Sequence, residues 1–321
     1  MKVLICHRPG GAFGYISDGW VNAFTSSGIT CQRWDGDQRT WDQFAPDLYI
    51  GCSGHRQPIP KNRGNTKIAI HVNPYGAKSV PGIDENRTAI DWVSSHKPNA
   101  VFGYGFAHHS PYWSKWDALW VPMPTAGDAV IYHCLLGTQR DIKLGYLGGC
   151  WAYKAKTINA YLLPLTKDEP KLTIFGWGDW PPELKVTGLL DNDVVNFFNR
   201  CMVVPCISEL HTQEYGIDLP ERVFKVILCG ALPVHDPVVG LNQNVLRSLP
   251  VAKNTDDYWS LCRLWCRPEM EAVRQTLVKQ LYDEVVSQHT YHHRLHHLMT
   301  ILGFTGAAKA LLSGLSTVLK K

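Results

Sequence analysis

Short apolar runs alternate with amphipathic segments along the first part of the chain. The apolar runs predict strands, and the 3.6-residue pattern predicts helices between them. The predicted strands are Lys2–Cys6, Ile29–Trp34, Leu48–Cys52, Lys67–Val72, Ala100–Gly103 and Ala118–Val121, with helices at Asp18–Ser27 and Arg87–Ser95. This alternation is typical of a parallel sheet, so we expect residues 1–137 to form a Rossmann-like lobe.

The same alternation begins again after Gly137. The predicted strands are Ile142–Leu147, Leu172–Phe175, Val186–Gly188, Met202–Pro205 and Ala231–Val234, with helices at Lys154–Leu163, Asp191–Asn199 and Pro220–Cys229. Helices then follow at Pro268–Ser287, Tyr291–Leu302 and Thr305–Lys320. We therefore expect an α/β protein with two Rossmann-like lobes facing a cleft. Residues 138–287 form the second lobe, and residues 288–321 are helices that pack back on the body.

Composition narrows the class of protein. The chain has 321 residues, a net charge of +4 and ten cysteines without the C-x-x-C spacing of zinc or redox sites. It shows no signal-peptide pattern and no apolar run of transmembrane length, which predicts a cytoplasmic protein. The mild positive charge permits an anionic ligand but does not by itself require nucleic acid or a membrane.

Glycines follow the first strand of each predicted lobe. In the first lobe Gly10, Gly11 and Gly14 precede a helix, where exposed backbone N–H groups could bind an anion or the glycines could simply make a tight turn. The spacing is not G-x-G-x-x-G, which disfavours a hydride-transfer cofactor. In the second lobe Gly148 and Gly149 precede Lys154, a cation in the first helical turn that would suit a bound diphosphate.

Two further sets of polar residues could carry chemistry. Glu221 and Arg222 follow Pro220 at a predicted helix start, where Arg can bind phosphate oxygens bidentately and Glu can bind ribose hydroxyls. His71, at the end of a buried strand, and Asp18 are our candidates for a catalytic base in an inverting transfer, with His7 and His55 as alternatives. A histidine cluster at residues 289–297 could hold zinc, but we predict a helix surface and no metal requirement.

The region Tyr146–Asp236 resembles the carboxy-terminal lobe of GT-B glycosyltransferases. The matching pieces are YLGGCWAYKAK, LTIFGWG, VTGLL and LPERVFKVILCGALPVHD. They are most similar to the spore-maturation glycosyltransferase-like family and more distantly to phage DNA β-glucosyltransferases, and HTYHHR at 289–294 fits the closing helix of the first family. The resemblance covers about half of the chain.

The resemblance implies a nucleotide-sugar donor, with a UDP-sugar as the first candidate, in the second lobe and an acceptor in the first. It places Arg222 and the loop of Gly148, Gly149 and Lys154 at the diphosphate. It also places the pocket for the nucleotide base near Phe175 to Trp177. Relatives carry a ribose-binding Glu three residues after the Arg, where this chain has Lys225, so Glu221 or another group would bind the ribose.

Three functions remain open from the sequence: a glycosyltransferase, which we favour, a nucleotide-sugar epimerase of the same fold, and a non-catalytic nucleotide- or sugar-binding protein. The acceptor also remains open. Hydroxylated bases in DNA are one candidate, with Arg56, Lys61, Arg63 and Lys67 as phosphate contacts. A polysaccharide, a protein and a small molecule are equally compatible with the sequence.

Overall fold

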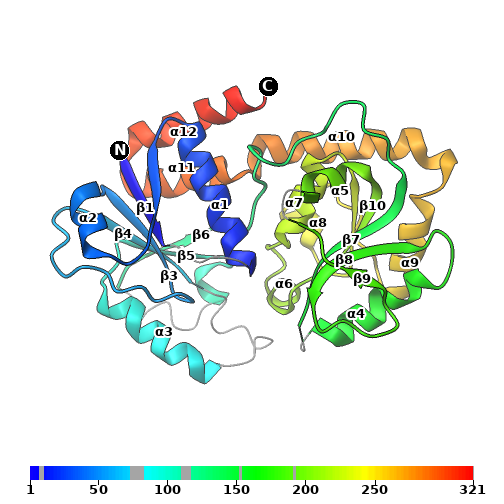
Figure 1. Cartoon of the computed structure of the whole chain (residues 1–321), viewed down its shortest axis with the longest axis horizontal. Helices are drawn as coiled ribbons and strands as arrows, with labels where there is room; N and C mark the ends of the chain where they lie inside the picture. Colours follow the sequence, from blue (N-terminus) through cyan, green and yellow to red (C-terminus); the bar gives the residue numbers. More distant parts are fainter. Residues whose placement is uncertain (7–10, 73–82, 110–116, 152–153, 191–192, 321) are drawn as a thin grey trace. The chain divides into compact units, whose positions relative to one another are not determined.

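A computed structural model of the chain describes residues 1–6, 11–72, 83–109, 117–151, 154–190 and 193–320. These residues divide into two compact units, coloured along the sequence in Figure 1. The first unit comprises residues 1–130 and 290–321, and the second comprises residues 131–289. The final helices therefore belong to the same unit as the first strand.

The first unit is built on a six-stranded, fully parallel sheet in the order β2-β1-β3-β4-β5-β6. Its strands are β1 (Lys2–Cys6), β2 (Thr30–Trp34), β3 (Leu48–Cys52), β4 (Lys67–His71), β5 (Ala100–Gly103) and β6 (Leu119–Pro122). The strand order reverses between β1 and β3. In such sheets ligands bind outside the carboxyl ends of the strands at the reversal.

The helices of the first unit include three that pack together. They are α1 (Gly11–Ser26), α11 (Tyr291–Ile301) and α12 (Thr305–Val318), side by side in Figure 1; α2 (Gln38–Phe44) and α3 (Ile83–Ser95) complete the set of α-helices described in this unit. A side chain on Gly19 would place its Cβ 2.2 Å from Cδ2 of Tyr291, so glycine allows α1 and α11 to approach. The predicted start of α1 at Asp18 was wrong. Burial of Phe13 and Ile16 extends the apolar face of the helix back to Gly11.

The second unit contains a five-stranded parallel sheet in the order β11-β10-β7-β8-β9. Its strands are β7 (Ile142–Cys150), β8 (Leu172–Gly178), β9 (Val186–Thr187), β10 (Cys201–Cys206) and β11 (Leu232–His235). The predicted ends of these strands at Leu147 and Phe175 were wrong, because β7 and β8 continue through Gly148 and Gly176, which are paired in the ladder. The order reverses between β7 and β10, as in Rossmann folds.

The helices of the second unit connect these strands and then cover the sheet. They are α4 (Ala155–Tyr161), α5 (Val194–Arg200), α6 (Leu210–Tyr215), α7 (Glu221–Leu228), α8 (Leu241–Asn244), α9 (Thr255–Leu264) and α10 (Glu271–Gln288). Helix α7 buries an apolar face of Val223, Phe224 and Ile227, and α10 packs against α7. The first turn of α7 lies at the carboxyl edge of β10, beside the strand reversal.

The cysteines carry no crosslink. All ten are free thiols; Cys134 is exposed, Cys31 is half-buried and the others are buried. Among the helices that the structure describes, none combines the length and apolar character needed to span a bilayer.

Candidate functional site

The carboxyl ends of β7 and β8 are lined by glycine. A Cβ on Gly148 would lie 2.3 Å from Nη2 of Arg222, and a Cβ on Gly176 would lie 2.1 Å from the carbonyl oxygen of Gly148. Glycine at these positions lets the arginine side chain and the neighbouring strand lie directly against the backbone of β7. The site therefore begins where β7 ends.

Arg222 crosses this edge from the first turn of α7. Its guanidinium carbon lies 4.3 Å from the centre of the Tyr146 ring, which holds the charged group over a buried aromatic face. Its Nη1 atom is buried and has no hydrogen-bond acceptor among the described residues. A buried guanidinium nitrogen without an acceptor is costly, so this position suits an anionic ligand.

Lys154 and Glu209 form an ion pair beside Arg222. The amino group of Lys154 is almost fully buried, whereas 29% of the Glu209 side chain is exposed. Burial lowers the pKa of Lys154, Glu209 opposes that shift, and the charge of Arg222 adds to it. Lys154 is the residue that precedes α4, not part of its first turn as predicted, and it brings a second cation to the same edge.

Glu221 and Lys225 bind each other on α7. The Lys225 Nζ atom lies 2.8 Å from Glu221 Oε2 and 5.0 Å from the centre of the Tyr132 ring. Burial disfavours the lysine cation, but the Glu221 carboxylate and the Tyr132 hydroxyl outweigh it and raise the pKa of Lys225. Lys225 thus acts on Glu221, whose carboxylate it fixes in the first turn of α7.

Tryptophans surround the end of the glycine edge. A Cβ on Gly149 would lie 2.7 Å from Trp151 and 3.0 Å from Trp177, so both indoles cover this glycine. Trp177 is 41% exposed and Trp151 is 40% exposed, and the indole N–H of Trp180 donates to the Trp177 carbonyl oxygen at 3.1 Å. Exposed indoles at a binding edge offer a stacking surface for a planar ring.

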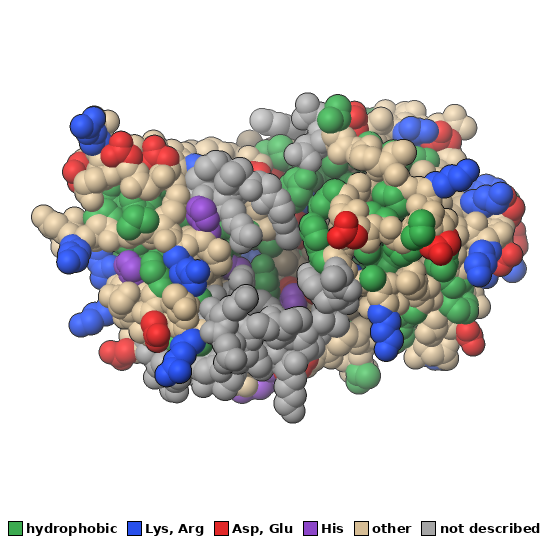
Figure 2. Space-filling view, turned by 60° about the horizontal axis from the view of Figure 1, so that its bottom comes forward, with side chains coloured by type: hydrophobic (Ala, Val, Ile, Leu, Met, Phe, Trp, Pro, Cys, Tyr) green, Lys and Arg blue, Asp and Glu red, His purple; other side chains and the backbone are tan. Residues whose placement is uncertain are grey.

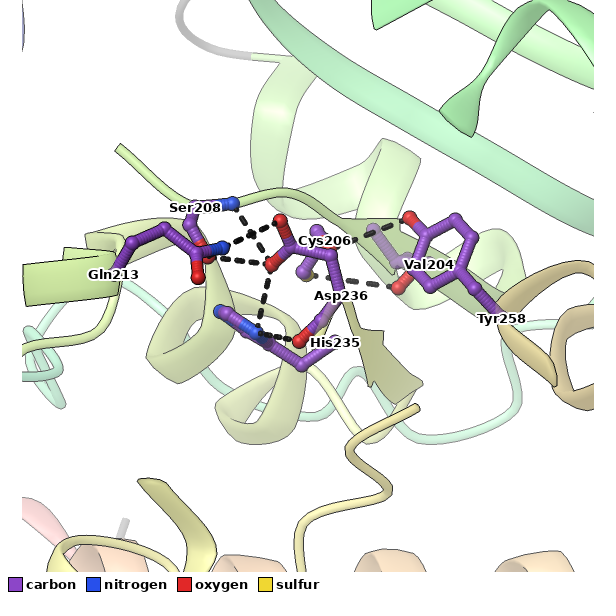
Figure 3. Close-up of polar contacts among 7 residues, drawn as sticks. All are labelled: Val204, Cys206, Ser208, Gln213, His235, Asp236 and Tyr258. Carbon is purple, nitrogen blue, oxygen red and sulfur yellow. Dashed lines mark hydrogen bonds and ion pairs between the residues drawn. The ribbon is translucent and has the colours of Figure 1, made fainter. Parts of the chain in front are cut away.

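A buried polar network, shown in Figure 3, fixes the loop after β10. Oδ1 of Asp236 accepts hydrogen bonds from the Ser208 amide at 3.0 Å and the Ser208 hydroxyl at 2.5 Å, and lies 3.0 Å from Nδ1 of His235. Gln213 donates more weakly to Oδ2 at 3.3 Å. The network ties the ends of β10 and β11 together next to Glu209.

Sequence reasoning missed Tyr146, Glu209 and Asp236 as parts of this site. Tyr146 lies within a predicted strand, and Glu209 and Asp236 lie in the segments that follow two others, which is the signal that would have placed them at the carboxyl edge of the sheet. The structure does bring together three of the predicted donor residues, Gly148, Lys154 and Arg222.

The predicted bases of the first unit have other surroundings. Asp18 lies on α1 with an exposed side chain that pairs with Arg33. His71 is 1% exposed and packs against four aromatic rings, those of Phe13, Trp20, Phe102 and Tyr104. Burial lowers the pKa of His71 to about 3. A weakly basic, enclosed imidazole is a poor proton acceptor near neutral pH, so a role in packing fits His71 better.

The glycines and histidines of the first unit also differ from the expected pattern. Gly11 and Gly14 lie inside the first turns of α1, whereas Gly10 and the alternative base His7 are outside the described residues. In the cluster at 289–297, His292 contacts the Ser26 hydroxyl at 3.0 Å and His296 donates through Nδ1 to the carbonyl oxygen of Ala308 at 2.9 Å. No group of potential metal ligands is found within the described ranges.

Two of the four basic residues predicted as DNA contacts, Arg63 and Lys67, form hydrogen bonds within the protein. Arg63 donates to the carbonyl oxygen of His96 at 2.8 Å, and the Lys67 amino group donates to that of Leu302. Figure 2 shows Lys and Arg side chains interspersed with Asp and Glu on the visible face rather than collected in one patch. These residues therefore give no separate support for a DNA-binding surface.

Comparisons with known proteins identify the fold. Residues 158–300 match the model of a family described as glycosyl transferase-like. No curated protein sequence matches the chain significantly. Among solved structures, HepE of Anabaena, in complex with UDP and glucose, is 12% identical with a TM-score of 0.61; the alignment covers 95% of this chain and 100% of that one.

Two glucosyltransferases share the same architecture. An α-glucosyltransferase, solved with UDP-glucose and DNA containing an abasic site, is 9% identical with a TM-score of 0.65, covering 94% of this chain and 98% of that one. The DNA-modifying enzyme β-glucosyltransferase is 10% identical with a TM-score of 0.58, covering 96% and 100%. The predicted GT-B fold is confirmed.

Proposed function

We propose that this chain, whose residues 158–300 form a glycosyltransferase-like domain, transfers a sugar from a UDP-sugar to an acceptor hydroxyl. The observation that carries the proposal is the buried Nη1 atom of Arg222, which lacks an acceptor among the described residues and lies beside Lys154. A donor diphosphate would supply that acceptor. Neither an epimerase nor a binding protein is favoured by the family match.

The two cations fit the chemistry of the leaving group. In a glycosyl transfer the bond between the anomeric carbon and the β-phosphate oxygen breaks, and a bond to the acceptor oxygen forms. In net terms the reaction releases UDP and one proton, and negative charge grows on the diphosphate as the old bond breaks. Arg222 offers a planar set of N–H donors and Lys154 a compact charge, and both favour the departing diphosphate over the bound donor.

The base and the ribose of the donor fit the side chains around this edge, which are the exposed indoles of Trp177 and Trp151 and the largely buried Glu221. In this proposal Trp177 and Trp151 stack against the nucleotide base, and Glu221, held by Lys225 in the first turn of α7, accepts hydrogen bonds from the ribose hydroxyls. Uracil as the base is supported by the similar folds of enzymes solved with UDP or UDP-glucose. We therefore assign to Glu221 the ribose contact that relatives make three residues after the arginine.

The test is calorimetry of the purified protein against UDP, GDP, ADP and dTDP, with and without added divalent metal. We expect micromolar binding of UDP that is lost in Arg222→Ala, with the thermal unfolding midpoint of the variant close to that of the wild type. Absence of binding to every nucleotide, with folded protein, would contradict a nucleotide-sugar donor.

The acceptor is tested once the donor is known. One of the similar structures is that of a DNA-modifying β-glucosyltransferase, and another is an α-glucosyltransferase solved with DNA, so hydroxymethylated duplex DNA is the first acceptor to incubate with UDP-glucose. Sugar on the DNA would identify a DNA-modifying enzyme. UDP release only in the presence of a saccharide or small-molecule acceptor would assign the protein to another acceptor class.

A further inference from the structure

The Lys154–Glu209 ion pair stands where the donor phosphates would bind, and this inference rests on the proposed function. Among the described residues, Lys154 is the one hydrogen-bond partner of the Glu209 carboxylate. The charge of Glu209 also acts on Arg222 and on the Tyr146 hydroxyl. One carboxylate thus faces both cations of the site.

We propose that Glu209 is a displaceable counter-ion, which neutralises Lys154 and Arg222 in the empty site and gives up Lys154 when a diphosphate binds. Two buried cations close together repel each other, and the carboxylate reduces that repulsion. A bound diphosphate makes the same contribution with more negative charge. It is repelled by Glu209, so the two anions compete for the amino group of Lys154.

The geometry allows this exchange. The backbone before Glu209 is fixed, because the amide and hydroxyl of Ser208 both donate to Asp236. The Glu209 side chain is less constrained: it is 29% exposed and makes no capping hydrogen bond to α6. The carboxylate can therefore rotate toward solvent while the loop and Lys154 stay in place.

Competition of this kind weakens the binding of every phosphate ligand at the site. Part of the free energy of diphosphate binding is spent on breaking the Lys154–Glu209 pair. The product UDP is affected as well as the donor, so the pair speeds product release. Glu209 is in this sense a regulator of donor and product affinity and takes no part in bond making.

The test measures binding of inorganic pyrophosphate and of UDP to the wild type and to Glu209→Gln. We expect both ligands to bind about tenfold more tightly to the variant, the factor expected when a hydrogen bond to a charged group no longer has to be broken. When Lys154 is already replaced, this gain in affinity should disappear, so Lys154→Gln/Glu209→Gln should bind both ligands no more tightly than Lys154→Gln. Glu209→Ala gives a second measurement if the first variant is unstable.

The matched control is Glu271→Gln. Glu271 is also a partly exposed carboxylate that pairs with an almost buried cation, Arg274, but it lies on α10 away from the strand ends. We expect Glu271→Gln to bind pyrophosphate and UDP with the affinities of the wild type. Equal or weaker binding of pyrophosphate to Glu209→Gln overturns the proposal for Glu209.

The two proposals fail in different ways. If the wild type binds pyrophosphate but no nucleoside diphosphate, the proposed function fails and the pyrophosphate titration still decides the role of Glu209. If UDP binds and Glu209→Gln has no effect, the counter-ion proposal alone fails. If no phosphate ligand binds either protein, both fail.

Discussion

Arg222 lies over the ring of Tyr146, with 4.3 Å between the guanidinium carbon and the ring centre. Tyr146 is fully buried in β7, and Arg222 enters from the first turn of α7. The ring restricts the guanidinium to one plane before any ligand arrives, which reduces the entropy lost when a diphosphate binds. This contact makes the shape of Arg222, and not only its charge, important.

Arg222→Lys should therefore fail to replace the arginine. Lysine keeps the positive charge but loses the planar set of donors and most of the contact with Tyr146. We expect UDP affinity to fall by about 10- to 100-fold, which corresponds to the roughly 1.5–3 kcal/mol of a hydrogen bond to a charged group. Calorimetry with UDP measures the change.

The control for this substitution is Arg200→Lys. Arg200 uses its planar guanidinium to bind the Asp141 carboxylate with two nitrogens, at 2.8 and 2.6 Å, but on an exposed face. Its replacement should leave UDP affinity within about twofold, because exposed ion pairs contribute little. Equal UDP affinity of Arg222→Lys and the wild type would show that the positive charge at this position is sufficient and that the planar shape of the arginine is not needed.

Gly148→Ala should block the site without unfolding the protein. The added methyl group would lie 2.3 Å from Nη2 of Arg222, so the guanidinium must move away from β7. We expect UDP binding to weaken at least as much as in Arg222→Lys, with a small change in the thermal unfolding midpoint.

Gly188→Ala is the matched control, because a Cβ at Gly188 meets nothing within 4 Å. It should bind UDP like the wild type. If Gly148→Ala also binds UDP normally, Arg222 does not need to lie against β7 to bind the donor.

Most of the strands could be predicted from sequence because each is a short apolar run between turn residues. The observed β1, β3 and β5 have the predicted bounds, and each of the other strands begins or ends within a few residues of its predicted bounds. The exceptions are the ends of β7 and β8, where glycines suggested a turn. Strand pairing overrides the turn preference of glycine, since Gly148 and Gly176 lie opposite each other in the parallel ladder between the two strands.

The site was harder to predict because its contacts join distant parts of the chain. The sequence placed Arg222 at a helix start but could not show that it reaches Tyr146. Nor could it pair Lys154 with Glu209, which depends on the order β10-β7 in the sheet. The position of His71 at a strand end suggested access to a ligand, whereas the aromatic side chains packed around it could be found only from the structure.

The stability of the first unit should fall in mild acid. Burial lowers the pKa of His71 to about 3, and burial together with His293 lowers that of His292 to about 4. The unfolded chain takes up these protons near pH 6.5, so the stabilisation is complete above that pH and is lost as the pH falls toward the folded values. At pH 5 each histidine should cost roughly 2 kcal/mol of unfolding free energy.

Urea denaturation between pH 7.5 and 4.5 measures this slope. His71→Leu should flatten it, because the substituted side chain cannot be protonated in either state. His108→Ala, at an exposed position, should leave the slope unchanged. A wild-type slope that His71→Leu does not reduce would show that His71 takes up its proton without unfolding.

Asp236→Asn tests whether the buried network holds the donor loop. Oδ1 of the carboxylate accepts two hydrogen bonds from Ser208 and contacts His235, and Oδ2 accepts from Gln213; asparagine loses the charge and turns a second NH2 group toward the Gln213 amide. We expect a loss of about 2–3 kcal/mol in unfolding free energy, measured by urea denaturation. Asp168→Asn is the control, since Asp168 pairs with Arg263 on the surface with 71% of its side chain exposed and should cost less than about 1 kcal/mol. Asp236→Asn should also weaken UDP binding, because the segment that leads to α7 and Arg222 follows from Ser208. A large loss of stability with unchanged UDP affinity would separate the network from the site and leave it a purely structural tie between β10 and β11.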